Sequence, residues 1–413
     1  MVFFYFQAHV FSQSKLMCIF LMKYDFDSVI ERRGTSCYKW DFTEKLVGEK
    51  DALPVWIADI DFKSPAPVIE ALKQRVEHGV FGYTLAPDSC YEAIIAWMRR
   101  RHGWEIEQDW IIFTPGVVSA FCWAVQAYTL PDDEVVIQPP VYYPFFKAVL
   151  NNGRQLIENR LVCREGRYEI DFEDLERKLA SPRARLLIFC SPHNPVGRVW
   201  TAEELRKLAE LCLKYEVTLC SDEIHSDLVF QGATHTPIAK LSEDVARNTV
   251  TCMAGNKTFG IPGLSTGFMI VSDPILRQKV LRIRENSGVT MQNLFGLLAT
   301  EVAYREGEEW LEELLRYLEG NLEFLIEFFD KKIPGIKVLR PDGCYLAWLD
   351  CRGLGKDHAE LKKFMLEEAK VWMNDGSVFG EGGNGFQRLN FACPRKTLET
   401  ALTRIEEAVK ALS

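Results

Sequence analysis

The sequence predicts an α/β fold in which a large domain, built on a mostly parallel and doubly wound sheet, is joined to a smaller α+β domain. The chain has 413 residues, beyond the roughly 250–300 residues at which one hydrophobic core stops growing. Short apolar strands alternate with helical segments up to Val271, which is typical of parallel sheets. The pattern then changes, so we expect a second domain.

The elements of the first part follow one another at short intervals. Pro67 suits the first turn of a helix, and Thr201 and Glu204 form a capping box that opens another one. Further helices are expected at 92–101 and 119–128, with a turn at 114–118. Strands are expected at 111–113, 134–138, 186–190, 217–220, 249–254 and 267–271.

The second part contains longer helical patterns and shorter strands. Residues 301–332 are charged and mostly helical, and short strands flank the turn Pro341-Asp342-Gly343. A glycine-rich loop at 376–385 precedes a strand at 386–391, and a final helix starts near Lys396. Residues 25–41 are interpreted as an irregular arm.

Composition excludes several classes of protein. Hydrophobic residues make up 47% and charged residues 26% of the chain, as in soluble globular proteins. The net charge of -9 argues against a nucleic-acid surface, and no apolar run approaches the roughly 18 residues of a membrane span. The twelve cysteines form no Cys-x-x-Cys pair. We therefore expect reduced thiols, no metal site and a cytoplasmic protein.

The first 21 residues differ from the rest. They are rich in Phe, carry only Lys15 as a positive charge and have no small-residue cleavage site, so they are a poor secretory signal. We interpret residues 1–21 as the result of a start codon assigned too early, or as a disordered leader. A functional anchor is the less favoured alternative.

Lys257 is the first candidate functional residue. It follows the apolar run 249–254 and a small-residue turn, which places it at the carboxyl end of a predicted strand, where open α/β sheets bind ligands. A lysine held partly out of water there can lower its pKa and act as a nucleophile or carry a proton. The alternative, a solvated turn lysine, is the common one for a lysine considered alone.

Two further segments bring polar groups to the same edge. Gly116, Val117 and Val118 lie between a strand and a helix, where backbone N–H groups can hold a phosphate; a plain turn is the alternative. Asn194 follows another strand and lies between two prolines, so its side-chain amide can donate to a phenolate-like oxygen.

Asp222 ends the next strand, and a buried carboxylate there requires a cationic partner such as a pyridinium N–H. His225 can face the same ligand or be a structural histidine. Arg388, flanked by apolar residues, offers a bidentate fork to a carboxylate. Lysine, aspartate, asparagine, phosphate turn and arginine together fit pyridoxal 5′-phosphate, with Lys257 forming the Schiff base.

The sequence strongly resembles the fold-type I pyridoxal-phosphate enzymes, and within them the MalY/PatB-type cystathionine β-lyases, or cysteine carbon–sulfur lyases. The resemblance runs from about Lys23 to the C-terminus. Its segments are Tyr38-Lys-Trp-Asp41, Ala58-Asp-Ile-Asp-Phe62, Val80-Phe-Gly-Tyr83, Ser191-Pro-His-Asn-Pro195, Ser221-Asp-Glu-Ile-His225, Asn256-Lys-Thr-Phe259 and Arg388-Leu-Asn-Phe-Ala-Cys-Pro394.

The resemblance implies further roles. Tyr142 should stack on the cofactor ring, Asn194 and His225 should hydrogen-bond its ring oxygen, and Asp59 should contact the substrate. Tyr83 should reach the cofactor phosphate of the neighbouring subunit in a homodimer with shared active sites. The large domain should comprise residues 68–300, and the small domain residues 22–67 and 301–413.

The sequence departs from related aminotransferases at three positions. Ser265 stands eight residues after the lysine, where many of them have an arginine that binds phosphate. Ala254 occupies a position that is often Ser, and Asn256 one where a small hydroxyl residue is common. The lyase group also tends to lack that arginine, so the departures support the subgroup and leave the phosphate ligands open.

The resemblance implies a carbon–sulfur β-lyase that releases a thiol, pyruvate and ammonia from cystathionine or another cysteine S-conjugate. An aminotransferase on the same scaffold is the alternative, because one intermediate can partition between both reactions. A third reading is a regulator that uses the fold as a binding module. No basic helix-turn-helix segment accompanies the fold, which disfavours DNA binding.

Overall fold

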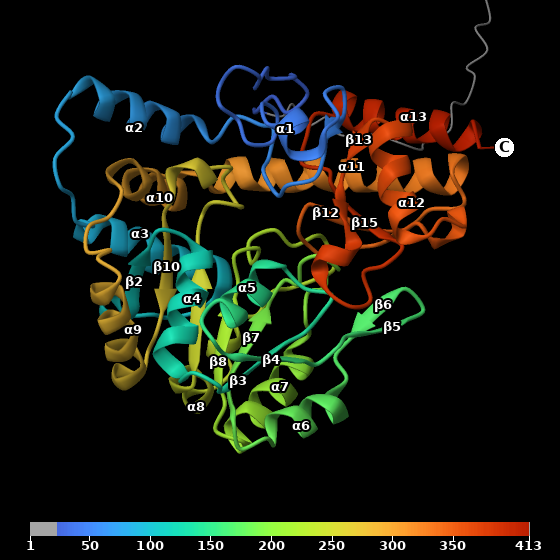
Figure 1. Cartoon of the computed structure of the whole chain (residues 1–413). Coiled ribbons are helices and arrows are strands. Elements are labelled where there is room, and N and C mark those ends of the chain that lie inside the picture. Colours follow the sequence, from blue (N-terminus) through green and yellow to red (C-terminus); the bar gives the residue numbers. More distant parts are fainter. Residues whose placement is uncertain (1–22, 413) are drawn as a thin grey trace, which may run out of the picture.

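A computed structural model describes residues 23–412, so the predicted leader at 1–21 lies outside the described residues. The fold is built on a seven-stranded sheet of order β2-β10-β9-β8-β7-β3-β4 (Figure 1). Its strands are β2 (Ile111–Thr114), β3 (Glu134–Ile137), β4 (Gln155–Glu158), β7 (Ala184–Cys190), β8 (Thr218–Asp222), β9 (Thr249–Met253) and β10 (Gly267–Ile270).

The strand directions confirm the predicted fold class. β9, β8, β7, β3 and β4 pair in parallel, and β10 runs antiparallel to both of its neighbours, β9 and β2. All strands except β10 therefore point the same way, and their carboxyl ends meet at one edge of the sheet. Segments that follow these strands are brought together there although they are far apart in the sequence.

Both faces of the sheet are covered by helices. Val135 and Ile137 of β3 pack into a cluster with Phe121 of α4 and Phe145 of α5, while Val136 between them packs on the opposite face. This alternation follows from the two-residue period of a strand. The helices of the chain are α1 (Thr43–Val47), α2 (Ala66–Glu77), α3 (Asp88–His102), α4 (Val117–Tyr128), α5 (Pro144–Leu150), α6 (Phe172–Leu179), α7 (Ala202–Lys214), α8 (Glu243–Arg247), α9 (Pro274–Asn286), α10 (Leu294–Glu306), α11 (Glu308–Lys332), α12 (His358–Lys363) and α13 (Arg395–Lys410).

A second, antiparallel sheet of order β11-β12-β15-β14 forms in the C-terminal part. The segment between the arm and α2 joins this part, because β1 (Leu53–Pro54) pairs in parallel with β13 (Val371–Trp372). Figure 1 shows α1 close to β13 at its top. A small hairpin of β5 (Val162–Arg164) and β6 (Arg167–Glu169) stands apart. The strands of the second sheet are β11 (Lys337–Leu339), β12 (Leu346–Asp350), β14 (Asn374–Asp375) and β15 (Phe386–Asn390).

The structure corrects one sequence expectation and refines another. Helix α4 begins at Val117, so the expected turn at 114–118 is shorter and Gly116 is the N-cap residue. The helical stretch expected at 301–332 is two helices, α10 and α11, which meet at Gly307. A β-carbon at Gly307 would lie 2.5 Å from the Ala303 carbonyl oxygen and 2.6 Å from the Phe259 ring. The close packing of α10 against Phe259 therefore requires glycine.

The predicted domain limits stay predictions. Residue 300 lies inside α10, which packs against α2 and α3.

The capping box at Thr201 and Glu204 is present at the start of α7, with both reciprocal hydrogen bonds. Between residues 23 and 412, no helix is long and apolar enough to cross a membrane.

Candidate active site

A pocket of about 300 Å³ opens at the carboxyl ends of the large sheet. Nine of the predicted site residues line it, and they come from six separate segments of the chain. They are Gly116, Val117, Val118, Tyr142, Asn194, Asp222, His225, Lys257 and Arg388. The parallel strands explain the convergence of all of these except Arg388, because each strand delivers its following loop to the same edge. Arg388 comes from β15 of the second sheet.

Lys257 lies in the turn after β9, and its side chain is half-buried in the pocket. Its Nζ donates a hydrogen bond to the carbonyl oxygen of Ala58 at 2.5 Å. Burial lowers the pKa of Lys257 and the Arg388 guanidinium adds to this effect, while Asp59 opposes it. The lowered pKa makes the neutral amine, which can act as nucleophile or base, more accessible than it is for a lysine in water.

Asp222 is the last residue of β8 and is 2% exposed. One of its carboxylate oxygens accepts a hydrogen bond from the Ile224 N–H at 3.2 Å. The pKa of Asp222 is raised to about 7, mainly by burial and also by the neighbouring Glu223 carboxylate, while the Ile224 hydrogen bond and the nearby Lys257 act in the opposite direction. A carboxylate in this position is stabilised by a cationic ligand group beside it.

His225 follows three residues later and is 3% exposed. Burial lowers its pKa to about 3, and the positive charges of Lys257 and Arg388 act in the same direction. Its Nδ1 has no hydrogen-bond partner among the described residues. The ring is therefore neutral and presents an unused polar atom, which supports the ligand-facing reading over the purely structural one.

Arg388 projects from the centre of β15 and is 2% exposed. Its Nη1 donates to Asn194 Oδ1 at 2.8 Å, and its Nη2 donates to the Trp56 carbonyl at 3.0 Å and to Asn374 Oδ1 at 2.5 Å. Its guanidinium also lies 4.8 Å from the centre of the Phe379 ring. Within residues 23–412 its Nε has no partner. A buried, oriented guanidinium of this kind is suited to binding a carboxylate.

The start of α4 forms another wall of the pocket. Gly116 is its N-cap residue and provides no capping side chain, and the first helical hydrogen bond is donated by Ala120. The N–H groups of Val117, Val118 and Ser119 therefore precede the helical hydrogen-bond ladder. Together with the helix dipole they make an anion site.

Asn194 and Tyr142 occupy the remaining predicted positions. Asn194 is 4% exposed and lies between Pro192 and Pro195, whose preceding peptide bonds are both cis. Tyr142 is in contact with Tyr143, with ring centres 5.4 Å apart. Burial raises the pKa of the Tyr142 phenol, so its hydroxyl stays protonated.

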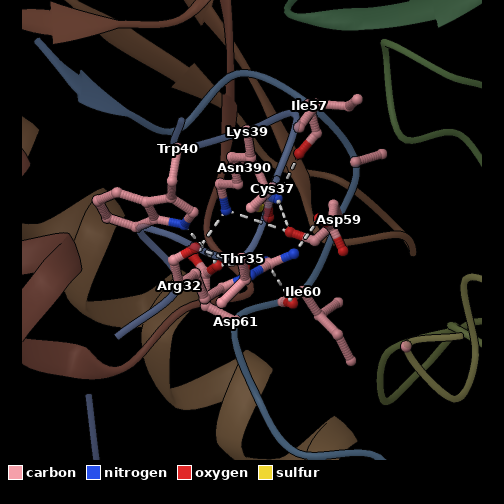
Figure 2. Close-up of polar contacts among 12 residues, drawn as sticks. Arg32, Thr35, Cys37, Lys39, Trp40, Ile57, Asp59, Ile60, Asp61 and Asn390 are labelled. Carbon is pink, nitrogen blue, oxygen red and sulfur yellow. Dashed lines mark hydrogen bonds and ion pairs between the residues drawn. The ribbon is translucent and has the colours of Figure 1, made fainter. Parts of the chain in front are cut away.

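Two predicted residues lie outside the pocket wall. Tyr83 is 95% exposed in the link between α2 and α3. Asp59 points toward the N-terminal arm, where its Oδ2 accepts a hydrogen bond from Arg32 Nη2 at 2.6 Å (Figure 2). The roles assigned to these two residues stay predictions.

The pocket also contains residues that sequence reasoning did not assign to it. Ser119 and Tyr143 are direct neighbours of predicted residues, so their proximity in the chain was the available signal. The Ile57 and Ala58 backbone carried no such signal, because only tertiary packing brings it to the lysine. The other unassigned wall residues are Pro115, Cys190, Ile224, Asn256, Pro262 and Ser265.

The donor set of the pocket fits pyridoxal 5′-phosphate. The unpartnered atoms His225 Nδ1, Asn256 Oδ1 and Arg388 Nε are buried polar groups at its wall. A cofactor and an amino-acid substrate can satisfy groups of these kinds, and the carboxylate of Asp222 suits a protonated ring nitrogen. In the part of the chain that the structure describes, no cluster of three or more His, Cys, Asp or Glu side chains could hold a metal ion.

Known proteins share this sequence and fold. Residues 58–405 match the model of the aminotransferase class I and II family. Cystathionine β-lyase PatB of Bacillus subtilis is 47% identical over 93% of this chain and its own full length, and protein MalY of Escherichia coli is 34% identical over 94% of this chain and its own full length.

The solved structure of cystalysin from Treponema denticola, which contains a pyridoxal 5′-phosphate cofactor, superposes with a TM-score of 0.92. It is 38% identical to this chain and covers 95% of it, and all of cystalysin is matched. The chain therefore belongs to the aminotransferase class I and II family and, within it, to the pyridoxal-phosphate-dependent cystathionine β-lyases of the PatB and MalY type.

Proposed function

We propose that this protein is a pyridoxal-phosphate-dependent carbon–sulfur β-lyase that converts cystathionine or a related cysteine S-conjugate, with water, to a thiol, pyruvate and ammonia. The observation that carries the proposal is the meeting of Lys257, Asp222 and Arg388 in one pocket. These residues supply an amine, a partner for a cationic ring and a fork for a carboxylate. The names of PatB and related lyases point to the same substrate class.

Each wall of the pocket has a proposed part in holding the cofactor. Lys257 would bind it covalently, Asp222 would hold the ring nitrogen, and the N–H groups at Gly116, Val117 and Val118 would hold the phosphate. Tyr142 lies against the ring, and Asn194 and His225 face its oxygen substituent. Bound there, pyridoxal 5′-phosphate supplies a carbonyl that condenses with amines and a ring that accepts negative charge from Cα.

The chain's own residues perform the remaining tasks. Arg388 orients the substrate carboxylate, so that the Cα–H bond faces Lys257. Lys257 Nζ removes the Cα proton, because burial lowers its pKa and leaves it free to act as a base. The wall formed by Ile57 and Ala58 keeps water from this proton transfer.

The stability of the cofactor-free protein should depend on pH through Asp222, because no pyridinium then lies beside its carboxylate. The pKa of Asp222 is raised from 3.8 to about 7 in the folded state. Between pH 3.8 and about 7, Asp222 is protonated in the folded state and ionised in the unfolded state. The free energy of unfolding therefore falls as pH rises through this window. The variant D222N should lose this pH dependence and be more stable than cofactor-free wild type at neutral pH, by about 4 kcal/mol at most.

Thermal melting of both cofactor-free proteins at acidic and neutral pH measures this difference. The same variant should bind pyridoxal 5′-phosphate more weakly, which equilibrium dialysis measures. D244N, at an exposed aspartate of α8, is the matched control. Identical melting profiles for wild type and D222N would contradict the assignment of Asp222.

We also propose a homodimer in which Tyr83 reaches the cofactor phosphate of the partner subunit. The link between α2 and α3 supports this, since Val80, Phe81, Tyr83 and Leu85 are all more than half exposed. Phe81 contacts Phe295 of α10, with ring centres 5.7 Å apart, so the exposed surface continues onto that helix. Exposed apolar groups gathered in this way indicate an interaction surface.

The variant Y83F should remain dimeric and bind pyridoxal 5′-phosphate about tenfold more weakly, the scale of one hydrogen bond to a charged group. Analytical ultracentrifugation gives the oligomeric state, and dialysis gives the cofactor affinity. Y38F, at a half-exposed tyrosine of the arm, is the control. A monomeric wild-type protein would contradict the shared site.

We place the protein in the cytoplasm, without nucleic-acid or membrane partners. The eleven cysteines within residues 23–412 are all free thiols, and most are buried. Free thiols are typical of a reducing compartment, and the net charge of -9 disfavours nucleic acid. The division into residues 68–300, and 22–67 with 301–413, remains our proposal for the domains.

Pyruvate release from L-cystathionine by purified protein, without an added 2-oxo acid, tests the proposed function. Sustained release is the expected result. Release that appears only with a 2-oxo acid acceptor, or amino-group transfer without pyruvate, would establish the aminotransferase alternative. Bound cofactor with no turnover on any thiol amino acid would favour a binding module.

A further inference from the structure

Residues 56–60, which we call the strap, connect the pocket to the N-terminal arm. Every one of the five consecutive carbonyl oxygens of the strap accepts a hydrogen bond from a distant side chain. The bonds are Arg388 to Trp56 at 3.0 Å, Asn390 to Ile57 at 2.7 Å, Lys257 to Ala58 at 2.5 Å, Lys39 and Asn390 to Asp59 at 3.2 and 2.9 Å, and Arg32 to Ile60 at 3.2 Å.

The donors divide into two groups. Lys257 and Arg388 reach the strap from the pocket. Arg32 and Lys39 reach it from the arm, as Figure 2 shows. The strap is therefore a shared anchor for the two residues that act on the substrate. Asn390 ties it to β15, two residues beyond Arg388.

Ion pairs fix the arm to Asp59 of the strap and to Asp61, the residue that follows the strap. Arg32 bridges Asp59 and Asp61 at 2.6 and 2.7 Å, and Lys39 pairs with the second oxygen of Asp61 at 2.6 Å. Trp40 Nε1 also donates to Asp61 at 3.2 Å. Two cations and two carboxylates balance in charge, and every one of them makes hydrogen bonds, as Figure 2 shows.

The burial of this network makes it costly to disturb. The Lys39 side chain is completely buried, and Asp61 is 6% exposed. Removing one partner of such a pair leaves an uncompensated charge. The arm is therefore a fixed part of the site in the structure, although it lies more than 190 residues before Lys257 in the chain.

We propose that Arg32 and Lys39 are positioning residues of the reaction, which hold the strap so that its carbonyls orient Lys257 and Arg388. The inference rests on the proposed function of the pocket. Lys257 must leave the Ala58 carbonyl when its nitrogen reacts. The strap then loses the hydrogen bond from Lys257, and the contacts with the arm keep the strap in place for the next proton transfer.

The same network sets the charge around Lys257. The titratable and charged groups that face Lys257 are Asp59, Asp222, His225, Cys344 and Arg388. Asp59 raises the pKa of Lys257, and Arg32 is the cation that neutralises Asp59. Removing the Arg32 charge should therefore raise the pKa of Lys257, and removing the Asp59 charge should lower it.

The experiment uses the full-length protein loaded with pyridoxal 5′-phosphate and the variants R32Q, R32K, D59N and R33Q. Arg33 is the matched control, because it is adjacent and exposed and its ion pair is with Glu31 at 3.8 Å, not with Asp59 or Asp61. Its guanidinium lies 4.8 Å from the centre of the Trp40 ring, so the control also tests whether this contact matters. Two quantities are measured for each. The first is kcat and KM for L-cystathionine as a function of pH. The second is the absorbance of the bound cofactor titrated with pH without substrate, which reports on the nitrogen of Lys257.

R32Q should lower kcat/KM about tenfold or more, the scale of a small misplacement of reacting groups. In R32Q, the acidic limb of the pH–rate profile and the midpoint of the absorbance titration should both move up by about half a pH unit. In D59N, both should move down. R32K should recover most of the activity, and R33Q should match wild type. Opposite shifts in R32Q and D59N cannot arise from loosened structure alone.

A kcat/KM of R32Q within about twofold of wild type would overturn the proposal, since misplacement of reacting groups costs more. An absorbance midpoint that does not move in D59N would also overturn it, and this result is accessible even where R32Q does not fold. Because the absorbance titration contains no substrate, it tests the network independently of the lyase assignment. Absence of pyruvate from wild type would instead contradict the proposed function.

Discussion

Replacing Lys257 with alanine should leave the fold intact and abolish pyruvate release. The side chain makes one hydrogen bond, to the Ala58 carbonyl, and its burial disfavours the charged amine. Its removal therefore costs little stability, because the lost bond is offset by the loss of a poorly solvated amine. Turnover should fall by at least about 10³-fold, because covalent attachment and proton transfer both depend on this nitrogen.

Three measurements define that result. Steady-state kinetics should show the loss of pyruvate release, thermal melting should show a folded protein, and dialysis should remove the cofactor that wild type retains. K279A, at an exposed lysine of α9, is the control and should behave as wild type. Full activity of K257A would refute the scheme as a whole.

Replacing Arg388 with alanine should mainly weaken substrate binding. The guanidinium is the buried cation best placed for a carboxylate, and a charged hydrogen bond contributes roughly 1.5–3 kcal/mol, which corresponds to about a 10- to 150-fold increase in KM. The melting temperature should also fall, because Asn194, Asn374 and the Trp56 carbonyl each lose a donor.

R388K separates charge from geometry. Lysine keeps the positive charge but cannot form the planar fork, so its KM should lie between those of wild type and R388A. R352A removes an exposed guanidinium near the same sheet and should leave KM unchanged. An unchanged KM in R388A would contradict the carboxylate assignment.

Much of the candidate site was predictable because its residues obey local rules. Asp222 and Lys257 each follow a short apolar strand, and parallel strands place such residues at one edge. Asn194 lies between two prolines after a third strand, and Arg388 lies in a strand that also contains Phe386 and Leu389. Each of these signals lies within a few residues of the chain.

Other features had no local signal. The mostly helical stretch expected at 301–332 is divided at Gly307, where Phe259, distant in sequence, packs too closely for a β-carbon. Helix α4 begins at Val117, earlier than expected, with Gly116 as its N-cap residue. The predicted position of Tyr83 in a partner's site depends on a surface that only a second copy can complete.

The sequence by itself determined the alternation of strands and helices, the lysine, aspartate and asparagine at the strand ends, and the arginine of β15. Strand period, turn residues and parallel topology are short-range properties, so they can be read along the chain. Only the tertiary structure decided that Asp59 pairs with Arg32 and that the carbonyls of Trp56 and Ala58 hold Arg388 and Lys257. Those contacts join backbone atoms to side chains far along the chain, and carbonyl groups are the same at every residue, so no sequence pattern marks which of them will be used.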